Sequence, residues 1–164
     1  MIVWLIDPDE SDPSIRWQVM RDLADSPEAE WRAERARVET EGWGARLLSH
    51  QDDDSRWAAG AHFPGDYVSG GYDDGQPWTS TTHVLSLLRE LGIEPTSPRM
   101  RWTVEAIGSN CRWEHDGQPY WEGEVEPCIN GVTVANGAYF GVDMAPVVER
   151  LVTERLEDPG GVEL

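Results

Sequence analysis

The 164-residue sequence contains no lysine, because all 13 of its basic residues are arginine. The chain therefore has neither a Schiff-base amine nor the lysine of a P-loop, and chemistry that depends on either is excluded. Basic residues of any kind are scarce beside 31 acidic ones, and the formal net charge is −18 at pH 7. Such a charge repels polyanions, so we expect neither nucleic acid nor an anionic membrane surface among the partners.

Cysteine is also scarce, with only Cys111 and Cys128 and no CxxC pair. We expect both to be free thiols in a reducing compartment. The apolar run MIVWLI at the N-terminus has no basic residue before it and is followed at once by Asp7, unlike a signal peptide. No window approaches the roughly 18 apolar residues of a membrane span. The sequence therefore predicts a cytoplasmic protein without membrane insertion.

Tryptophan is abundant by contrast, with nine residues against two phenylalanines. Two interpretations stay open for this composition: aromatic packing between helices, or a cavity lined by aromatic rings. The tryptophans are spread along the chain, which favours packing for most of them.

Helix signals dominate the rest of the sequence. Asp12 and Pro13 supply an N-cap followed by proline at the first helical position, and Ile15, Val19 and Leu23 recur at four-residue spacing. Further helices are predicted over 27–40, 45–50, 79–91, 98–110, 129–140 and 144–157. The valines in 129–140 also allow a strand, but we predict a buried helix there, and we expect Trp102 to face inward.

The predicted fold is all-α, with about seven helices in antiparallel hairpins within a single domain, 1–164. Polar-faced helices alternate with more apolar ones, which predicts an outer and an inner layer. Two stretches rich in glycine, proline and acidic residues are predicted as long loops, 51–77 and 111–128. The last residues, 158–164, are predicted to fray.

Several segments resemble the squalene cyclase-like and prenyltransferase-like proteins of the terpenoid cyclase superfamily. The spacing of the QW motif of triterpene cyclases is followed, with serine in place of one glycine, by Gly44, Leu47, Gln51, Ser55 and Trp57. Longer similar segments cover 14–19, 75–79, 112–119 and 124–131. The resemblance implies an α/α toroid, in which two concentric layers of helices surround a cavity, and this chain resembles its N-terminal half.

The resemblance also implies a site for an apolar, isoprenoid-type small molecule. The DxDD acid with which class II cyclases protonate a double bond does not occur in this sequence. The zinc ligands of protein prenyltransferases lie in a later part of the toroid, which has no counterpart in this chain. Two functions therefore stay open: an isoprenoid-type enzyme domain, or a non-catalytic module that sequesters an apolar small molecule or pairs with a second toroid half.

Candidate site residues gather before and within the predicted inner helices. The candidate acid–base residues are His83, His115, Glu124 and Glu126. The candidate ligand contacts are Trp78, Trp113, Tyr120, Trp121, Cys128 and Asn130, and the four aromatic side chains among them would form an aromatic box. Some of these groups suit zinc, but no pair has the spacing of a familiar site, and we predict no metal and no cofactor.

Half a toroid would leave the outer sides of its first and last helices uncovered. The apolar residues expected there are Ile15, Val19 and Leu23 at one end and Val147, Leu151 and Val152 at the other. Contiguous apolar patches usually mark an interface, and a two-fold axis would cover both at once. We therefore expect a homodimer, or a partner subunit that completes the toroid.

Overall fold

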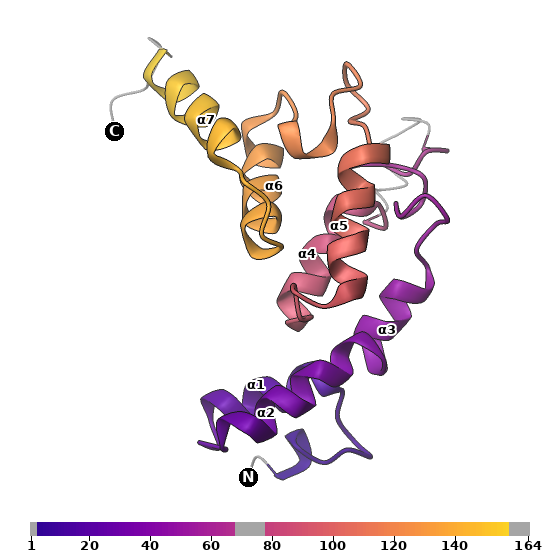
Figure 1. The fold of residues 1–164 in the computed structure, drawn as a ribbon, viewed down its shortest axis with the longest axis vertical. Helices are drawn as coiled ribbons and strands as arrows, with labels where there is room; N and C mark the ends of the chain where they lie inside the picture. Colours follow the sequence, from indigo (N-terminus) through magenta and orange to yellow (C-terminus); the bar gives the residue numbers. More distant parts are fainter. Residues whose placement is uncertain (1–2, 68–77, 158–164) are drawn as a thin grey trace, which may run out of the picture.

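The computed structural model describes residues 3–67 and 78–157, which fold into helices with no β-strand among them (Figure 1). The α-helices are α1 (Pro13–Asp22), α2 (Glu28–Ala36), α3 (Gly42–Ser49), α4 (Thr81–Leu91), α5 (Pro98–Asn110), α6 (Pro127–Tyr139) and α7 (Ala145–Glu157). Short 3-10 helices cover Val3–Leu5, Arg37–Glu39 and Tyr120–Glu122. The predicted all-α class is confirmed. Part of the first predicted loop, 68–77, and the predicted frayed tail, 158–164, lie outside the described residues.

Local capping explains where several helices begin and end. The Asp12 side chain accepts a hydrogen bond from the Ser14 N–H at the start of α1, and the Ser97 side chain accepts one from the Met100 N–H at the start of α5. Gly92 ends α4 in the left-handed conformation, with φ of 78°, that glycine adopts without strain. These boundaries match the sequence signals closely.

The helices succeed one another along the molecule. The pair α1 and α2 lies at the end that carries the N-terminus, and α7 lies at the opposite end (Figure 1). Between them α3 packs against α4, α4 against α6, and α6 against α7. In the described parts of the chain, none of the helices is long and apolar enough to traverse a bilayer.

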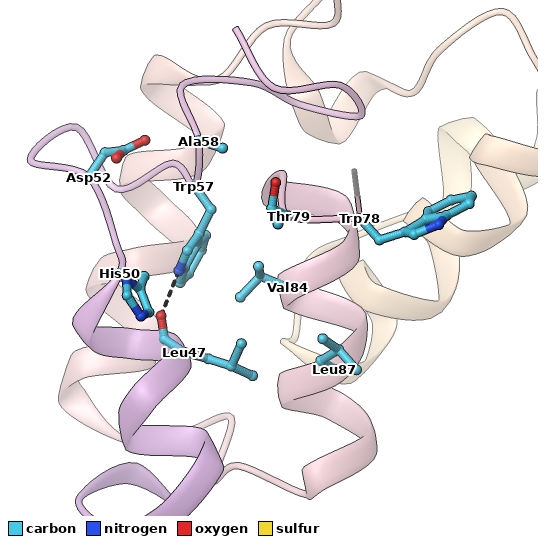
Figure 2. Close-up of a pocket in the computed structure, with 9 residues that line it drawn as sticks. All are labelled: Leu47, His50, Asp52, Trp57, Ala58, Trp78, Thr79, Val84 and Leu87. Atoms are coloured by element: carbon cyan, nitrogen blue, oxygen red, sulfur yellow. Dashed lines mark hydrogen bonds between the residues drawn. The ribbon is translucent and has the colours of Figure 1, made fainter. Parts of the chain in front are cut away.

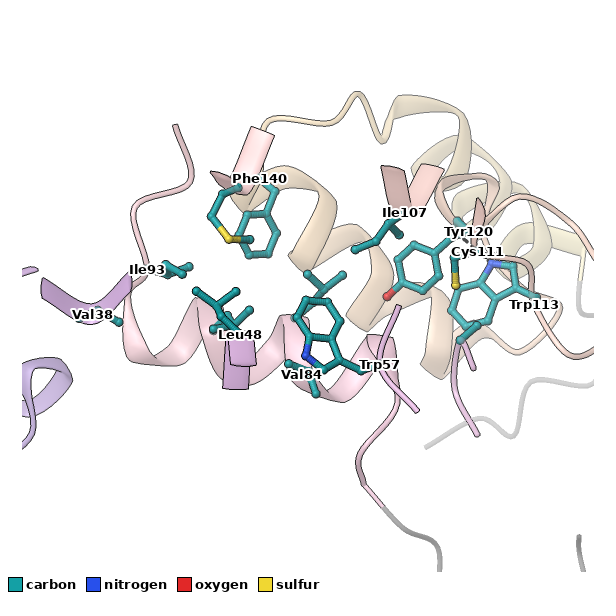
Figure 3. Close-up of a cluster of buried hydrophobic side chains, with 14 of the residues drawn as sticks. Val38, Leu48, Trp57, Val84, Ile93, Ile107, Cys111, Trp113, Tyr120 and Phe140 are labelled. Atoms are coloured by element: carbon teal, nitrogen blue, oxygen red, sulfur yellow. Dashed lines mark hydrogen bonds between the residues drawn. The ribbon is translucent and has the colours of Figure 1, made fainter. Parts of the chain in front are cut away.

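An aromatic stack forms one part of the hydrophobic core (Figure 3). Trp113 lies on Tyr120 with their ring centroids 4.7 Å apart and an interplanar angle of 17°. The Tyr120 hydroxyl donates a hydrogen bond to Oγ1 of Thr82 on α4, at 3.1 Å. Burial raises the pKa of the Tyr120 hydroxyl far above its ordinary value. The stack therefore fastens the second predicted loop to the start of α4.

The residues that match the QW spacing tie α3 to its neighbours. The Trp57 indole N–H donates to the Leu47 carbonyl near the end of α3, at 2.8 Å, and the ring is buried. The Gln51 side-chain amide donates to the Ser55 carbonyl at 3.1 Å and to Thr103 Oγ1 on α5 at 3.2 Å. Both side chains satisfy buried polar groups while they pack, which gives the motif a structural role.

Trp102 was expected to face inward but is 57% exposed, because the inward stripe of α5 is formed by Met100, Thr103 and Ile107, and Trp102 lies on the opposite side. On α1, Leu23 is exposed, as expected for the uncovered end of the predicted half toroid, but Val19 is buried in the core. The predictions for Trp102 and Val19 were wrong because a broad apolar pattern does not define which side of a helix meets the core.

Helix α6 inverts the burial predicted for it. Its inward side chains are polar, among them Asn130, Thr133 and Asn136, whereas Val132 is exposed. The Asn130 amide exchanges two hydrogen bonds with the backbone of Glu124, and the Asn136 amide donates to the Thr82 carbonyl at 3.2 Å. The buried side of α6 is polar because its asparagines form hydrogen bonds with backbone groups of neighbouring segments. The prediction of a buried apolar helix was therefore wrong.

We expect Trp57→Phe to lower the free energy of unfolding by about 2 kcal/mol, because it removes a buried hydrogen bond and leaves part of the ring volume empty. The matched control is Trp102→Phe, an exposed position where a change below about 0.5 kcal/mol is expected. Urea unfolding of the three proteins provides the measurement. Equal losses in the two variants would contradict the role given to Trp57.

Candidate functional site

An apolar groove runs between α3 and α4 (Figure 2). Its volume is about 430 Å³, and it is lined by Leu47, His50, Asp52, Trp57, Ala58, Trp78, Thr79, Val84 and Leu87. A second hollow of about 290 Å³ shares Leu47, His50 and Leu87 with it and extends to Trp43, Arg46 and Leu91. Together the two hollows have the size at which proteins bind small molecules.

Helical spacing builds the two walls of the groove. On α4, Val84, Leu87 and Leu91 recur at three- and four-residue intervals along one side, while Leu85 and Leu88 point into the core. Leu87 is 46% exposed, although it lies in the leucine-rich stretch of α4. The groove therefore exists because the apolar face of α4 is broader than the core covers.

The wall opposite is the side of α3 that carries Leu47 and His50. Figure 2 shows Leu47 and Leu87 facing each other across the gap, with Trp57 and Val84 farther along it. The Asp52 carboxylate stands near the Trp57 end and accepts a hydrogen bond from the Ala59 N–H at 2.8 Å. Aliphatic walls with an indole at one end suit a ligand held by burial of apolar surface.

Beside the groove, His83 of α4 lies against His62 of the first predicted loop. Their ring centroids are 4.7 Å apart, and His83 Nε2 is 3.1 Å from the His62 carbonyl oxygen. Trp78 packs edge-on against the His83 ring, also at 4.7 Å, and its own ring points away from the groove (Figure 2). Sequence reasoning selected His83 alone, because His62 is 21 positions away in an irregular segment.

Burial lowers the pKa of both histidines below the ordinary value. For His83 the neighbouring His62 lowers the pKa further, while for His62 the carboxylates of Glu114 and Glu124 partly oppose the effect of burial. His62 Nδ1 is buried and has no hydrogen-bond partner within the described residues. The burial of both rings therefore favours the neutral form of each imidazole.

Glu114 holds His62 in place, a role that the sequence did not suggest. Its Oε1 accepts hydrogen bonds from the backbone N–H groups of Ala61, His62 and Phe63, at 2.8, 3.0 and 3.1 Å. A carboxylate that meets three successive amides fixes the conformation of that turn. The only sequence signal was a glutamate inside a loop, which does not point to any partner.

The other acid–base candidates do not converge. His115 is exposed and lies 3.4 Å from the Asp116 carboxylate, and Glu126 and Cys128 are exposed as well. Glu124 is buried, and its Oε2 accepts from the Glu126 N–H at 2.5 Å. Within residues 3–67 and 78–157 no three potential metal ligands come together.

The expected aromatic box is not an open one. Trp113 and Tyr120 are buried in the stack described above, and Trp121 meets Tyr120 edge-on while its indole N–H donates to the Val104 carbonyl at 3.1 Å. Asn130 is fully buried against Glu124. Of the six predicted ligand contacts, Trp78 is the one that borders the groove. The others face core or solvent elsewhere because the second predicted loop folds onto α4 and α5.

No protein-family model matches the chain, and comparisons with curated proteins and with solved structures find no match either.

We expect the free energy of unfolding to decrease as the pH falls from about 7.5 to 5.5. The folded-state pKa values of His62 and His83 lie below the unfolded value, so the unfolded chain binds more protons in this range and the stability present at higher pH is lost. The slope reaches at most about 1.4 kcal/mol per pH unit for each proton.

Replacement of both histidines by glutamine is expected to flatten this pH dependence, measured by urea unfolding at several pH values. His115→Gln, at an exposed position, serves as the control and should keep the wild-type slope. A wild-type slope in the double variant would show that other groups cause the decrease.

Proposed function

We propose that the chain is a binding module for an apolar small molecule, which lies in the groove between α3 and α4. The observation that carries the proposal is a groove of about 430 Å³ with an apolar lining, in which Leu87 is 46% exposed and Leu47 is only partly buried. Apolar surface in water is unfavourable by about 25 cal/mol per Å², so a ligand that covers such walls gains free energy. Exposed apolar patches of this kind mark binding sites.

The lining of the groove favours the non-catalytic alternative over an enzyme. Its titratable side chains are His50, Asp52 and, in the second hollow, Arg46. None of the acid–base residues selected from the sequence is among the described residues that line it, and the His62–His83 pair, which packs against Trp78, is not part of the lining either. We therefore propose that the groove binds a ligand and does not catalyse a reaction.

A relationship to squalene cyclase-like proteins is a further part of the proposal. Two residues of the QW-like spacing, Leu47 and Trp57, line the groove, and the Trp57 indole N–H donates a hydrogen bond to the Leu47 carbonyl. An isoprenoid-type molecule is apolar and is of the kind that such walls accommodate. The arrangement of the helices as half a toroid belongs to the same proposal.

A second copy of the chain is the proposed partner, and it would cover the outer side of α6 and α7. Val132 on α6 and Val148 and Val152 on α7 are all exposed, Val152 by 55%. Val147, expected on this surface, is buried, and Leu151 is half-buried beside it. Burial of these valines in a dimer would remove an apolar patch from water.

Leu87→Asn tests the groove directly. It replaces half-exposed apolar surface without opening the core, and we expect about fivefold weaker binding of 1-octanol in isothermal titration calorimetry. Val125→Asn is the matched control, an equally exposed apolar position outside the groove, and should bind like the wild type. Equal binding by Leu87→Asn, or no octanol binding by the wild type, would overturn the proposed site.

Light scattering at micromolar protein concentration tests whether the chain forms a dimer. The salt concentration is about 0.15 M, at which the repulsion between negative charges is screened beyond about 8 Å. We expect a dimer that Leu151→Asp dissociates and Leu87→Asn leaves intact. A wild type that is monomeric throughout the micromolar range would exclude this interface.

A further inference from the structure

The second hollow of the groove carries two basic side chains at its edge. Arg46 lies on α3 and His50 caps the end of that helix four positions later, and both side chains line the same hollow. The remaining lining of that hollow is apolar: Trp43, Leu47, Leu87 and Leu91. A cationic group at the margin of an apolar trough is the arrangement that holds an amphiphile by its head.

Within the described residues, the Arg46 guanidinium has no carboxylate partner, unlike most arginines of this acidic chain. Seven other arginines each lie within 4 Å of a carboxylate: Arg16, Arg21, Arg32, Arg35, Arg37, Arg56 and Arg89. The side chain of Arg46 makes no hydrogen bond or ion pair within the part of the chain that the structure describes, and the side chain of Arg101 on α5 shares this property. Arg46 lines the second hollow, so its guanidinium is available to a ligand.

The two ends of the groove have opposite polarity. Arg46 lines only the hollow near Trp43, whereas Asp52 lines only the one near Trp57. One oxygen of Asp52 is already bound to the Ala59 N–H, and the side chain lies in the field of Arg56. A ligand anion at the Arg46 end meets an unused cation, while a ligand cation at the Asp52 end competes with existing partners.

We propose that the ligand of the groove is an aliphatic carboxylate, whose head pairs with Arg46 and whose chain lies between Leu47 and Leu87; this inference rests on the proposed function. A guanidinium binds a carboxylate through two parallel hydrogen bonds, and His50 adds a further donor in the same hollow. The net charge of −18 opposes the approach of an anion, but salt screens that repulsion beyond about 8 Å.

Three ligands with the same eight-carbon chain separate the head from the tail: octanoate, 1-octanol and octylammonium, each titrated by calorimetry below its aggregation limit. We expect the wild type to bind octanoate about tenfold more tightly than octanol, the scale of one charge-assisted contact at a solvent-exposed site. Arg46→Gln should remove this preference while octanol binding stays unchanged. Arg46→Lys should retain part of it, since it keeps the charge and loses the second hydrogen bond.

Arg101→Gln is the matched control, because it makes the same change of charge at an exposed arginine away from the groove. Octanoate that binds no more tightly than octanol would overturn the carboxylate and leave the proposed apolar site standing. Equal losses in Arg46→Gln and Arg101→Gln would also overturn it, since net charge would then explain the preference. Tightest binding of octylammonium would assign the head to the Asp52 end instead, and absence of binding by all three ligands would overturn the groove itself.

Discussion

The groove depends on the buried indole of Trp57. Its ring N–H donates to the Leu47 carbonyl of α3, and its backbone N–H donates to Oγ1 of Thr81 at the start of α4, at 3.2 Å. One residue of the connecting loop therefore holds two helices at a fixed separation while its ring fills the end of the gap between them (Figure 2). Because Trp57 is hydrogen-bonded to both helices and keeps them apart, Leu47 and Leu87 face each other without closing the groove.

The start of α4 is the second fixed point. Hydrogen bonds from the Thr81 and Thr82 backbone N–H groups to the carbonyls of Gly60 and Ala61 fasten the loop to the helix, and Glu114 binds the amides that follow. These contacts join three segments that are far apart in the chain. They place His62 against His83, and they fasten the α4 wall of the groove to the loop that carries Trp57.

The sequence predicted the helices well and the faces of the helices poorly. Caps at Asp12 and Ser97 and the glycine at the end of α4 are local signals, and local signals define boundaries. Which face is buried depends on the neighbours: Asn130 is buried because the Glu124 backbone needs its amide. Leu87 fitted the pattern of a core residue, and nothing in its spacing distinguished a groove wall from a core position.

A titration of the ¹⁵N-labelled protein with 1-octanol, followed by two-dimensional NMR, tests whether the groove between α3 and α4 is the binding site. If the ligand lies in this groove, the largest chemical-shift changes fall on the amides of α3 and of the α4 residues around Leu87, and on the indole N–H of Trp57. Changes that concentrate instead on Trp113, Tyr120 and Trp121, with α3 and the α4 wall unaffected, would contradict it.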